Sequence, residues 1–172
     1  NVTPKPLTSL LFAGTNRVYD GSTAATVTLN KSGSGIVGAD NVTTTQSATF
    51  VDKNVGTGKT INIADVVLAG SDAANYTVGA VAATATANIT VRPVTLSGIT
   101  ATNRPYDGTT EVAVNASGVT SAGFIGTDDI DVALPPGGLT SGTVATKGVG
   151  NDKVVTVTGL AQSGTDAGNY SI

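Results

Sequence analysis

Apolar and hydroxyl-bearing residues alternate with a period of two along much of the chain. The alternation is clearest in residues 25–29, 60–63, 83–91, 112–114 and 154–158. A period of two places successive side chains on opposite faces of a strand, so each of these segments should bury one face. β-branched residues are abundant and Glu111 is the only glutamate, which disfavours helix. The pattern predicts an all-β protein, with at most a short helical turn near residues 38–42 and 126–130.

One phrase of the sequence occurs twice. Residues 15–23 read TNRVYDGST and residues 102–110 read TNRPYDGTT, an offset of 87. Residues 72–76, DAANY, return as residues 166–170, DAGNY, at an offset of 94. The difference of seven residues falls in the Pro- and Gly-rich stretch 134–139, which is typical of a lengthened surface loop. A fixed period of this kind indicates copies of one folded unit in series.

The repeats divide the chain into two modules. Residues 1–5 match the segment before the second copy and are assigned to the tail of a preceding repeat. The first repeat covers residues 6–92, and the second covers residues 93–172 and lacks its last strand, the counterpart of residues 77–91. Because no methionine is present, we interpret the chain as a piece of a longer array. Six or seven short strands per module predict two tandem antiparallel β-sandwiches of immunoglobulin-like type in an extended array, with β-grasp-like modules as the alternative.

The repeated residues are predicted to be structural. Asp-Gly tolerates left-handed backbone in a turn, and the tyrosine before it offers a large ring that can close a small core. Aromatic residues make up only 4% of the chain, so the four tyrosines should be buried anchors. The structural signature comprises Tyr19, Asp20, Gly21, Asn75 and Tyr76 in the first copy and Tyr106, Asp107, Gly108, Asn169 and Tyr170 in the second.

Composition narrows the classes of function. The chain has no histidine and no cysteine, which removes the usual proton shuttle, thiolate nucleophile and zinc ligands, so we expect no catalytic residues and no enzyme. Charged residues are sparse at 12% and the net charge is −3, so no nucleic-acid partner is expected. No long apolar run of the kind that spans a bilayer occurs either, and we expect no membrane insertion.

Three acidic residues stand close together in the second copy. Asp128, Asp129 and Asp131 could offer oxygen ligands to Ca²⁺, and Asp40 is the only matching acid in the first copy. The set has no distant acid or carbonyl to complete a coordination sphere, so solvated loop carboxylates are the alternative interpretation. Apart from this calcium hypothesis, the sequence predicts no metal and no cofactor.

Four segments carry a family resemblance. Residues 19–23 (YDGST), 38–42 (GADNV), 52–59 (DKNVGTGK) and 72–76 (DAANY) resemble the YDG-type repeat domain of large bacterial surface adhesins, the filamentous haemagglutinin-like exoproteins. The second copy departs from this pattern at residues 146–153 (TKGVGNDK). The resemblance implies an extracellular protein of the bacterial cell surface, exported by two-partner secretion, that serves cell adhesion or biofilm cohesion.

Two hypotheses about function follow. The first is a structural stalk or spacer that extends a binding tip and has neighbouring repeats of the same chain as its partners. Residues 91–94 (VRPV) support it, because they join the copies through a proline without a flexible Gly/Ser linker. The alternative is that the repeats bind a surface glycan, an exopolysaccharide or a host or matrix protein through loops such as residues 134–139.

Overall fold

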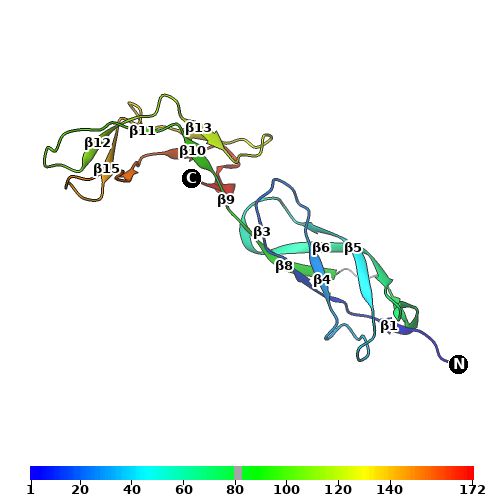
Figure 1. The fold of residues 1–172 in the computed structure, drawn as a ribbon. Helices are drawn as coiled ribbons and strands as arrows, with labels where there is room; N and C mark the ends of the chain where they lie inside the picture. The colour runs from blue at the N-terminus through cyan, green and yellow to red at the C-terminus, as the bar shows by residue number, and fades with distance from the viewer. Residues whose placement is uncertain (80–82) are drawn as a thin grey trace. The chain divides into compact units, whose positions relative to one another are not determined.

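The protein divides into two compact units, residues 1–91 and residues 92–172 (Figure 1). The computed structural model describes residues 1–79 and 83–172. In these ranges nearly all regular structure is β-strand, which confirms the all-β prediction, and the only helices are two 3₁₀ turns, η1 (Ala73–Asn75) and η2 (Ala167–Asn169). The predicted location of the helical turns is wrong, because residues 38–42 and 126–130 contain tight turns without helix.

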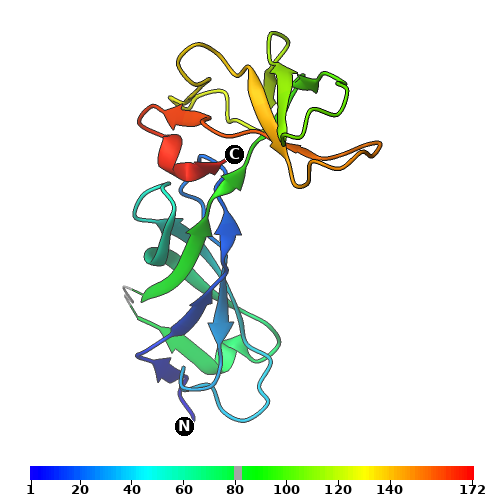
Figure 2. The same cartoon turned by 90° about the vertical axis from the view of Figure 1, so that its left-hand side faces the viewer.

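The described residues of the first unit form one sheet of four strands and two sheets of two strands. Its strands are β1 (Lys5–Leu7), β2 (Leu11–Gly14), β3 (Arg17–Val18), β4 (Val27–Asn30), β5 (Thr43–Phe50), β6 (Gly56–Ala69), β7 (Tyr76–Val78) and β8 (Ala83–Thr90). The larger sheet has the order β3-β8-β6-β5, and the smaller ones are β1-β7 and β2-β4. Strand β8 therefore lies inside the larger sheet, between β3 and β6 (Figures 1 and 2).

Strand β8 places its alternate side chains in the core of the first unit. Ala83, Ala85, Ala87 and Ile89 are buried, while the residues between them are exposed or half-buried. The alternation seen in the sequence thus corresponds to one buried face, as expected for a strand. Ala85 lies opposite Ile61 of β6, which is also fully buried, so the two strands share one apolar layer.

Strand β2 crosses β8 at very short range. A Cβ atom placed on Gly14 would lie 2.6 Å from the carbonyl oxygen of Thr86 and 3.0 Å from the Cβ of Ala87. Such distances are below normal contact, so glycine is what permits this approach of two backbones.

The second unit contains one sheet of four strands and three sheets of two strands. Its strands are β9 (Arg92–Pro93), β10 (Thr95–Ser97), β11 (Thr100–Ala101), β12 (Glu111–Asn115), β13 (Thr120–Ala122), β14 (Asp131–Ala133), β15 (Ser141–Val144), β16 (Val155–Thr156), β17 (Ala161–Ser163) and β18 (Tyr170–Ser171). The larger sheet has the order β11-β12-β15-β16, and the smaller ones are β10-β13, β14-β17 and β9-β18.

Strand pairing in the second unit repeats that of the first. The β5–β6 ladder pairs Phe50 with Ile61, and the β15–β16 ladder pairs Val144 with Val155 at the equivalent positions. Likewise β1 runs parallel to β7, and β9 runs parallel to β18. The described part of the second unit, however, contains no strand at the position that β8 occupies in the first.

Most of the extra residues of the second unit lie in one loop. In the first unit a single residue of β5, Gln46, interrupts the pairing of that strand with β6. The equivalent interruption in the second unit is the loop of residues 134–140 between β14 and β15. Six of the seven inserted residues therefore lie here, in the Pro- and Gly-rich stretch. Leu139 of this loop is only 5% exposed and belongs to a buried cluster with Val114 and Ala116. The insertion thus enlarges a small core as well as the surface.

Two expectations about the architecture are wrong. The sheets are not purely antiparallel, because β1–β7, β3–β8 and β9–β18 are parallel pairs between distant parts of a unit, which local periodicity cannot reveal. In addition, Lys5 is not in the tail of a preceding repeat: it begins β1 and pairs with Tyr76. Arg92 takes the same place opposite Tyr170, so the units meet between Val91 and Arg92.

Candidate functional site

The Tyr-Asp-Gly phrase forms a turn that its own side chains hold. One carboxylate oxygen of Asp20 accepts hydrogen bonds from the backbone N–H and the hydroxyl of Ser22, both at 2.9 Å. Gly21 has a φ of 78°, a left-handed conformation that favours glycine, and Arg17 forms an ion pair with Asp20. Burial alone would raise the pKa of Asp20, but the bonds from Ser22 and the Arg17 guanidinium outweigh it and lower that pKa. The aspartate therefore shapes the turn as a carboxylate.

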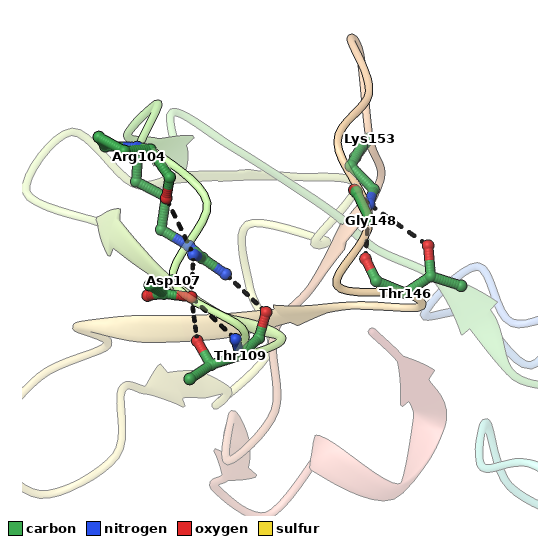
Figure 3. Close-up of polar contacts among 7 residues, drawn as sticks. Arg104, Asp107, Thr109, Thr146, Gly148 and Lys153 are labelled. Carbon is green, nitrogen blue, oxygen red and sulfur yellow. Dashed lines mark hydrogen bonds and ion pairs between the residues drawn. The ribbon is translucent and has the colours of Figure 1, made fainter.

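The second unit builds the same turn (Figure 3). Asp107 accepts hydrogen bonds from the backbone N–H and the hydroxyl of Thr109, both at 2.8 Å, and these bonds hold the pKa of Asp107 below its ordinary value. Gly108 has a φ of 81°. Arg104 pairs with Asp107 and donates to the Thr109 carbonyl at 2.8 Å. The turn is thus a property of the local sequence in both units.

The tyrosine of the phrase has different surroundings in the two units. Tyr19 is 0% exposed, and the Lys53 ammonium lies 5.9 Å from the centre of its ring. Tyr106 is 60% exposed, so the expectation that it is a buried anchor is wrong. The reason lies outside the phrase: Tyr19 adjoins β8, where its N–H donates to the Thr90 carbonyl at 2.9 Å, whereas no described strand covers the equivalent face beside Tyr106.

The second repeated tyrosine ties a distant loop to the end of each unit. The Tyr76 hydroxyl donates to the Asp40 carboxylate at 2.6 Å, and the Tyr170 hydroxyl donates to the Asp128 carboxylate at 2.6 Å. Each hydroxyl also accepts a backbone N–H from three residues before that aspartate, at 2.9 and 3.1 Å. The bond to Asp40 raises the pKa of Tyr76, and burial together with the bond to Asp128 raises the pKa of Tyr170.

A further aspartate holds the same loop. The Asp72 carboxylate accepts the Asn41 N–H at 2.7 Å, and the Asp166 carboxylate accepts the Asp129 N–H at 3.1 Å. In each unit one loop is therefore fixed twice, by a tyrosine hydroxyl and by a carboxylate that precedes that tyrosine in the chain.

The two signature asparagines end the 3₁₀ turns. The N–H groups of Asn75 and Asn169 each donate at 3.0 Å to the carbonyl three residues earlier. Asn169 is buried, whereas Asn75 is exposed, so the shared role of the two residues is in the backbone turn.

A lysine closes the hairpin between β5 and β6 in the first unit and the equivalent hairpin between β15 and β16 in the second. Lys59 forms an ion pair with Asp52 at 2.5 Å. Lys153 takes the equivalent place, but Thr146 stands where the carboxylate was, and the ammonium donates to the backbone carbonyls of Thr146, at 2.5 Å, and Gly148 (Figure 3). In the second unit, backbone carbonyl oxygens thus take the place of the Asp52 carboxylate as acceptors for the lysine.

The second unit carries a cleft of ≈ 640 Å³. Its lining comprises residues 101–106 and 147–153 together with Val112, Val144 and Val155. The equivalent residues 14–19 and 53–59 of the first unit stand around β8, which pairs with both segments. The cleft therefore lies at the position that a strand fills in the first unit.

Comparison with known proteins bears on this pair of units. A family model described as the YDG domain matches residues 3–87 and residues 90–172. The chain belongs to the YDG domain family. The two matches coincide closely with the two compact units, which are hereafter the first and second YDG domains. No curated protein and no solved structure matches the chain.

The three calcium candidates of the second YDG domain face different partners. Asp128 accepts the Tyr170 hydroxyl, and Asp129 accepts the N–H and the hydroxyl of Thr165, both at 3.0 Å, which lowers the pKa of Asp129. Asp131 is exposed on β14. Within the described residues no three acidic side chains are grouped so that they could hold a metal ion, and calcium binding stays a prediction. No described helix is long and apolar enough to cross a membrane.

Sequence reasoning missed part of the network in each YDG domain. It did not assign Asp40 as the partner of the Tyr76 hydroxyl or Asp72 as the partner of the Asn41 N–H. Both aspartates lie in segments that recur in the second copy. It also left out Arg17 and Arg104, which recur beside the phrase and clamp its turn. The available signal was recurrence. Local conformational preference alone gives no reason for an acid or an arginine to stand at the same position in both copies.

Proposed function

We propose that the two YDG domains are a structural spacer of a secreted or cell-surface bacterial adhesin of the filamentous haemagglutinin-like kind. In this role, modules of immunoglobulin-like size extend a binding tip away from the cell for adhesion or biofilm cohesion. The observation that carries the proposal is the use of the repeated polar residues: each of Asp20, Asp107, Tyr76 and Tyr170 bonds within its own domain. Residues that recur because they build the fold are what a spacer needs.

The junction between the domains supports the same proposal. Strand β8 ends at Thr90 and strand β9 begins at Arg92, so a single residue, Val91, separates the two. Pro93, two residues after Val91, fixes one backbone angle, and the segment has no Gly/Ser linker. A connection this short restrains how far the domains can turn, which favours an extended array over independent domains.

Small-angle X-ray scattering of the full chain tests the spacer. The matched control inserts Gly-Ser-Gly-Ser after Val91. We expect the native chain to fit one extended arrangement and the inserted variant to require a broad ensemble with a shorter mean dimension. If the native chain needs the same broad ensemble as the inserted variant, the spacer loses its mechanical basis.

A binding assay separates the spacer from its alternative, in which surface loops bind a glycan, an exopolysaccharide or a host or matrix protein. The loop at residues 134–140 is the natural candidate, but its Leu139 is committed to the core. We expect no binding of the chain to a glycan array or to immobilised matrix proteins. Specific binding that disappears when residues 135–138 are replaced by a two-residue Asn-Gly turn would favour the alternative.

A further inference from the structure

We propose that Asp20–Gly21 and Asp107–Gly108 are latent isomerisation sites, which the side chains of the folded turn keep unreacted. They are the only Asp-Gly steps in the sequence. The residues that hold each aspartate, hereafter its clamp, are Arg17 and Ser22 in the first domain and Arg104 and Thr109 in the second. Each clamp thus protects the covalent backbone as well as shaping the turn, and this chemistry is independent of what the domains do.

The reaction at an Asp-Gly step is a ring closure within the backbone. The amide nitrogen of the glycine forms a bond to the side-chain Cγ of the aspartate and loses its proton, and one carboxyl oxygen leaves as water. Addition of water to the resulting succinimide breaks one of its two C–N bonds, which gives either aspartate or isoaspartate. Glycine favours the closure because no side chain shields its nitrogen. The closure needs a neutral carboxyl group that can turn towards that nitrogen.

The fold requires a glycine after each of these aspartates. The φ angles of Gly21 and Gly108 are 78° and 81°, in the left-handed region. A residue with a Cβ costs about 1–2 kcal/mol in this conformation. The turn therefore contains the residue that promotes isomerisation, and it does so in contact with water, because the side chains of Asp20 and Asp107 are 50% and 51% exposed. Burial does not protect these aspartates.

Polar contacts hold the carboxylate of the first turn. One oxygen of Asp20 accepts the N–H and the hydroxyl of Ser22, both at 2.9 Å, and pairs with Arg17. As a neutral acid that turns towards the Gly21 nitrogen, Asp20 would lose the ion pair and these charge-assisted bonds, which are stronger than bonds between neutral groups. The lowered pKa of Asp20 also leaves fewer neutral carboxyl groups at neutral pH. Geometry and protonation both oppose the ring closure.

The arginine of each clamp is itself held in place. The Arg17 side chain is 17% exposed, its guanidinium lies 5.2 Å from the centre of the Phe50 ring, and it donates to the Ser22 carbonyl. The Arg104 side chain is 25% exposed and donates to the Thr109 carbonyl at 2.8 Å (Figure 3). The presence of the same clamp at both Asp-Gly steps of the chain is the observation that carries the proposal.

Incubation of the full chain at neutral pH, both folded and unfolded in urea, tests the proposal. Endoproteinase Asp-N cleaves before aspartate and not before isoaspartate, so a missed cleavage at unchanged peptide mass measures isomerisation at each step. We expect isoaspartate to accumulate at both steps in the unfolded chain. In the folded chain the accumulation should be several-fold slower at both.

Variants of the clamp separate its effect from that of a rigid backbone. Arg17→Gln should raise the rate several-fold at the step of the first domain and leave that of the second unchanged. Arg104→Gln should do the reverse, so each domain is the control for the other. Ser22→Ala removes one donor from an exposed residue and should give a smaller rise. Val18→Ala, on an exposed apolar side chain of the same segment, should leave both rates unchanged.

Three results would overturn the protective role of the clamp. One is the absence of isoaspartate from the unfolded chain, which would mean that the steps are not labile. Another is an equal rate in the folded and the unfolded native chain. The third is an unchanged rate in the arginine variants and in Ser22→Ala when urea unfolding shows them to be folded. Ser22→Ala keeps the arginine, so it decides the matter if Arg17→Gln unfolds the first domain.

Discussion

Truncation of the two equivalent tyrosines should have very different effects on stability. Tyr19 is 0% exposed and Tyr106 is 60% exposed, although both belong to the same phrase and the same turn. Truncation of a fully buried large aromatic residue to alanine costs about 3–5 kcal/mol, because it removes apolar burial and leaves a cavity. A domain of this size has a free energy of unfolding of about 5–15 kcal/mol. Tyr19→Ala therefore removes a large fraction of it, whereas Tyr106→Ala should cost less than about 1 kcal/mol.

Differential scanning calorimetry of the full chain measures both effects. One kcal/mol shifts the unfolding temperature of such a domain by about 4–8 °C, so Tyr19→Ala should lower the transition of the first domain by at least about 12 °C. Tyr106→Ala should shift the transition of the second domain by a few degrees at most. Tyr19→Phe is the control, because it keeps the ring in the core and should preserve most of the stability.

Similar shifts for the two alanine variants would refute this reasoning. They would mean that the turn, which is the same in both domains, determines the contribution of the tyrosine. A larger shift for Tyr106→Ala would contradict the observed exposure of that side chain.

Three further predictions concern pH and backbone conformation. The raised pKa values of Tyr76 and Tyr170 mean that folding favours the neutral phenol, so the stability that they confer is present below their ordinary pKa of 10.0 and is lost as pH rises above it. Urea midpoints should fall between pH 9 and pH 11, and the double Phe variant should flatten that fall. The lowered pKa of Asp129 acts in the opposite sense. The stability that this carboxylate confers is present above its ordinary pKa of 3.8 and is lost as pH falls through its pKa in the folded protein. Asp129→Asn should therefore reduce the loss of stability between pH 5 and pH 2. Gly108→Ala should destabilise the second domain by about 1–2 kcal/mol in chemical denaturation, because the φ of 81° at this position is unfavourable for alanine. Gly126→Ala is the control. Neither glycine has an atom close enough to clash with a new Cβ, and Gly126 has no positive φ, so this variant should have nearly the native stability.

The strands and the repeat could be predicted from the sequence because both are local signals. The alternation of residues 83–91 gave the buried face of β8. The repeated phrase placed the boundary between the repeats after residue 92, and the two compact units divide after Val91. The Asp20 turn is equally local, since its partners lie two and three residues away. Short-range chemistry of this kind is the same wherever the phrase occurs.

The burial of Tyr106 could not be predicted in this way. Whether this tyrosine is covered depends on a strand that in the first domain pairs more than seventy residues further along the chain, Arg17 with Ile89. The Tyr76–Asp40 bond and the parallel pairing of β1 with β7 have the same character, because their partners are distant in sequence and leave no periodic trace. Two similar phrases can therefore differ in burial when a strand that is distant in the sequence covers only one of them.

The position of β8 has a consequence for mechanical load. This strand lies between β3 and β6, and Val91 alone connects it to the second domain. A pulling force that enters through Val91 acts along the strand and loads the hydrogen bonds on both of its sides together, in shear. An edge strand pulled at right angles would instead release its bonds one after another. Extraction of β8 from the first YDG domain under tension therefore requires the β3–β8 and β8–β6 ladders to break at the same time.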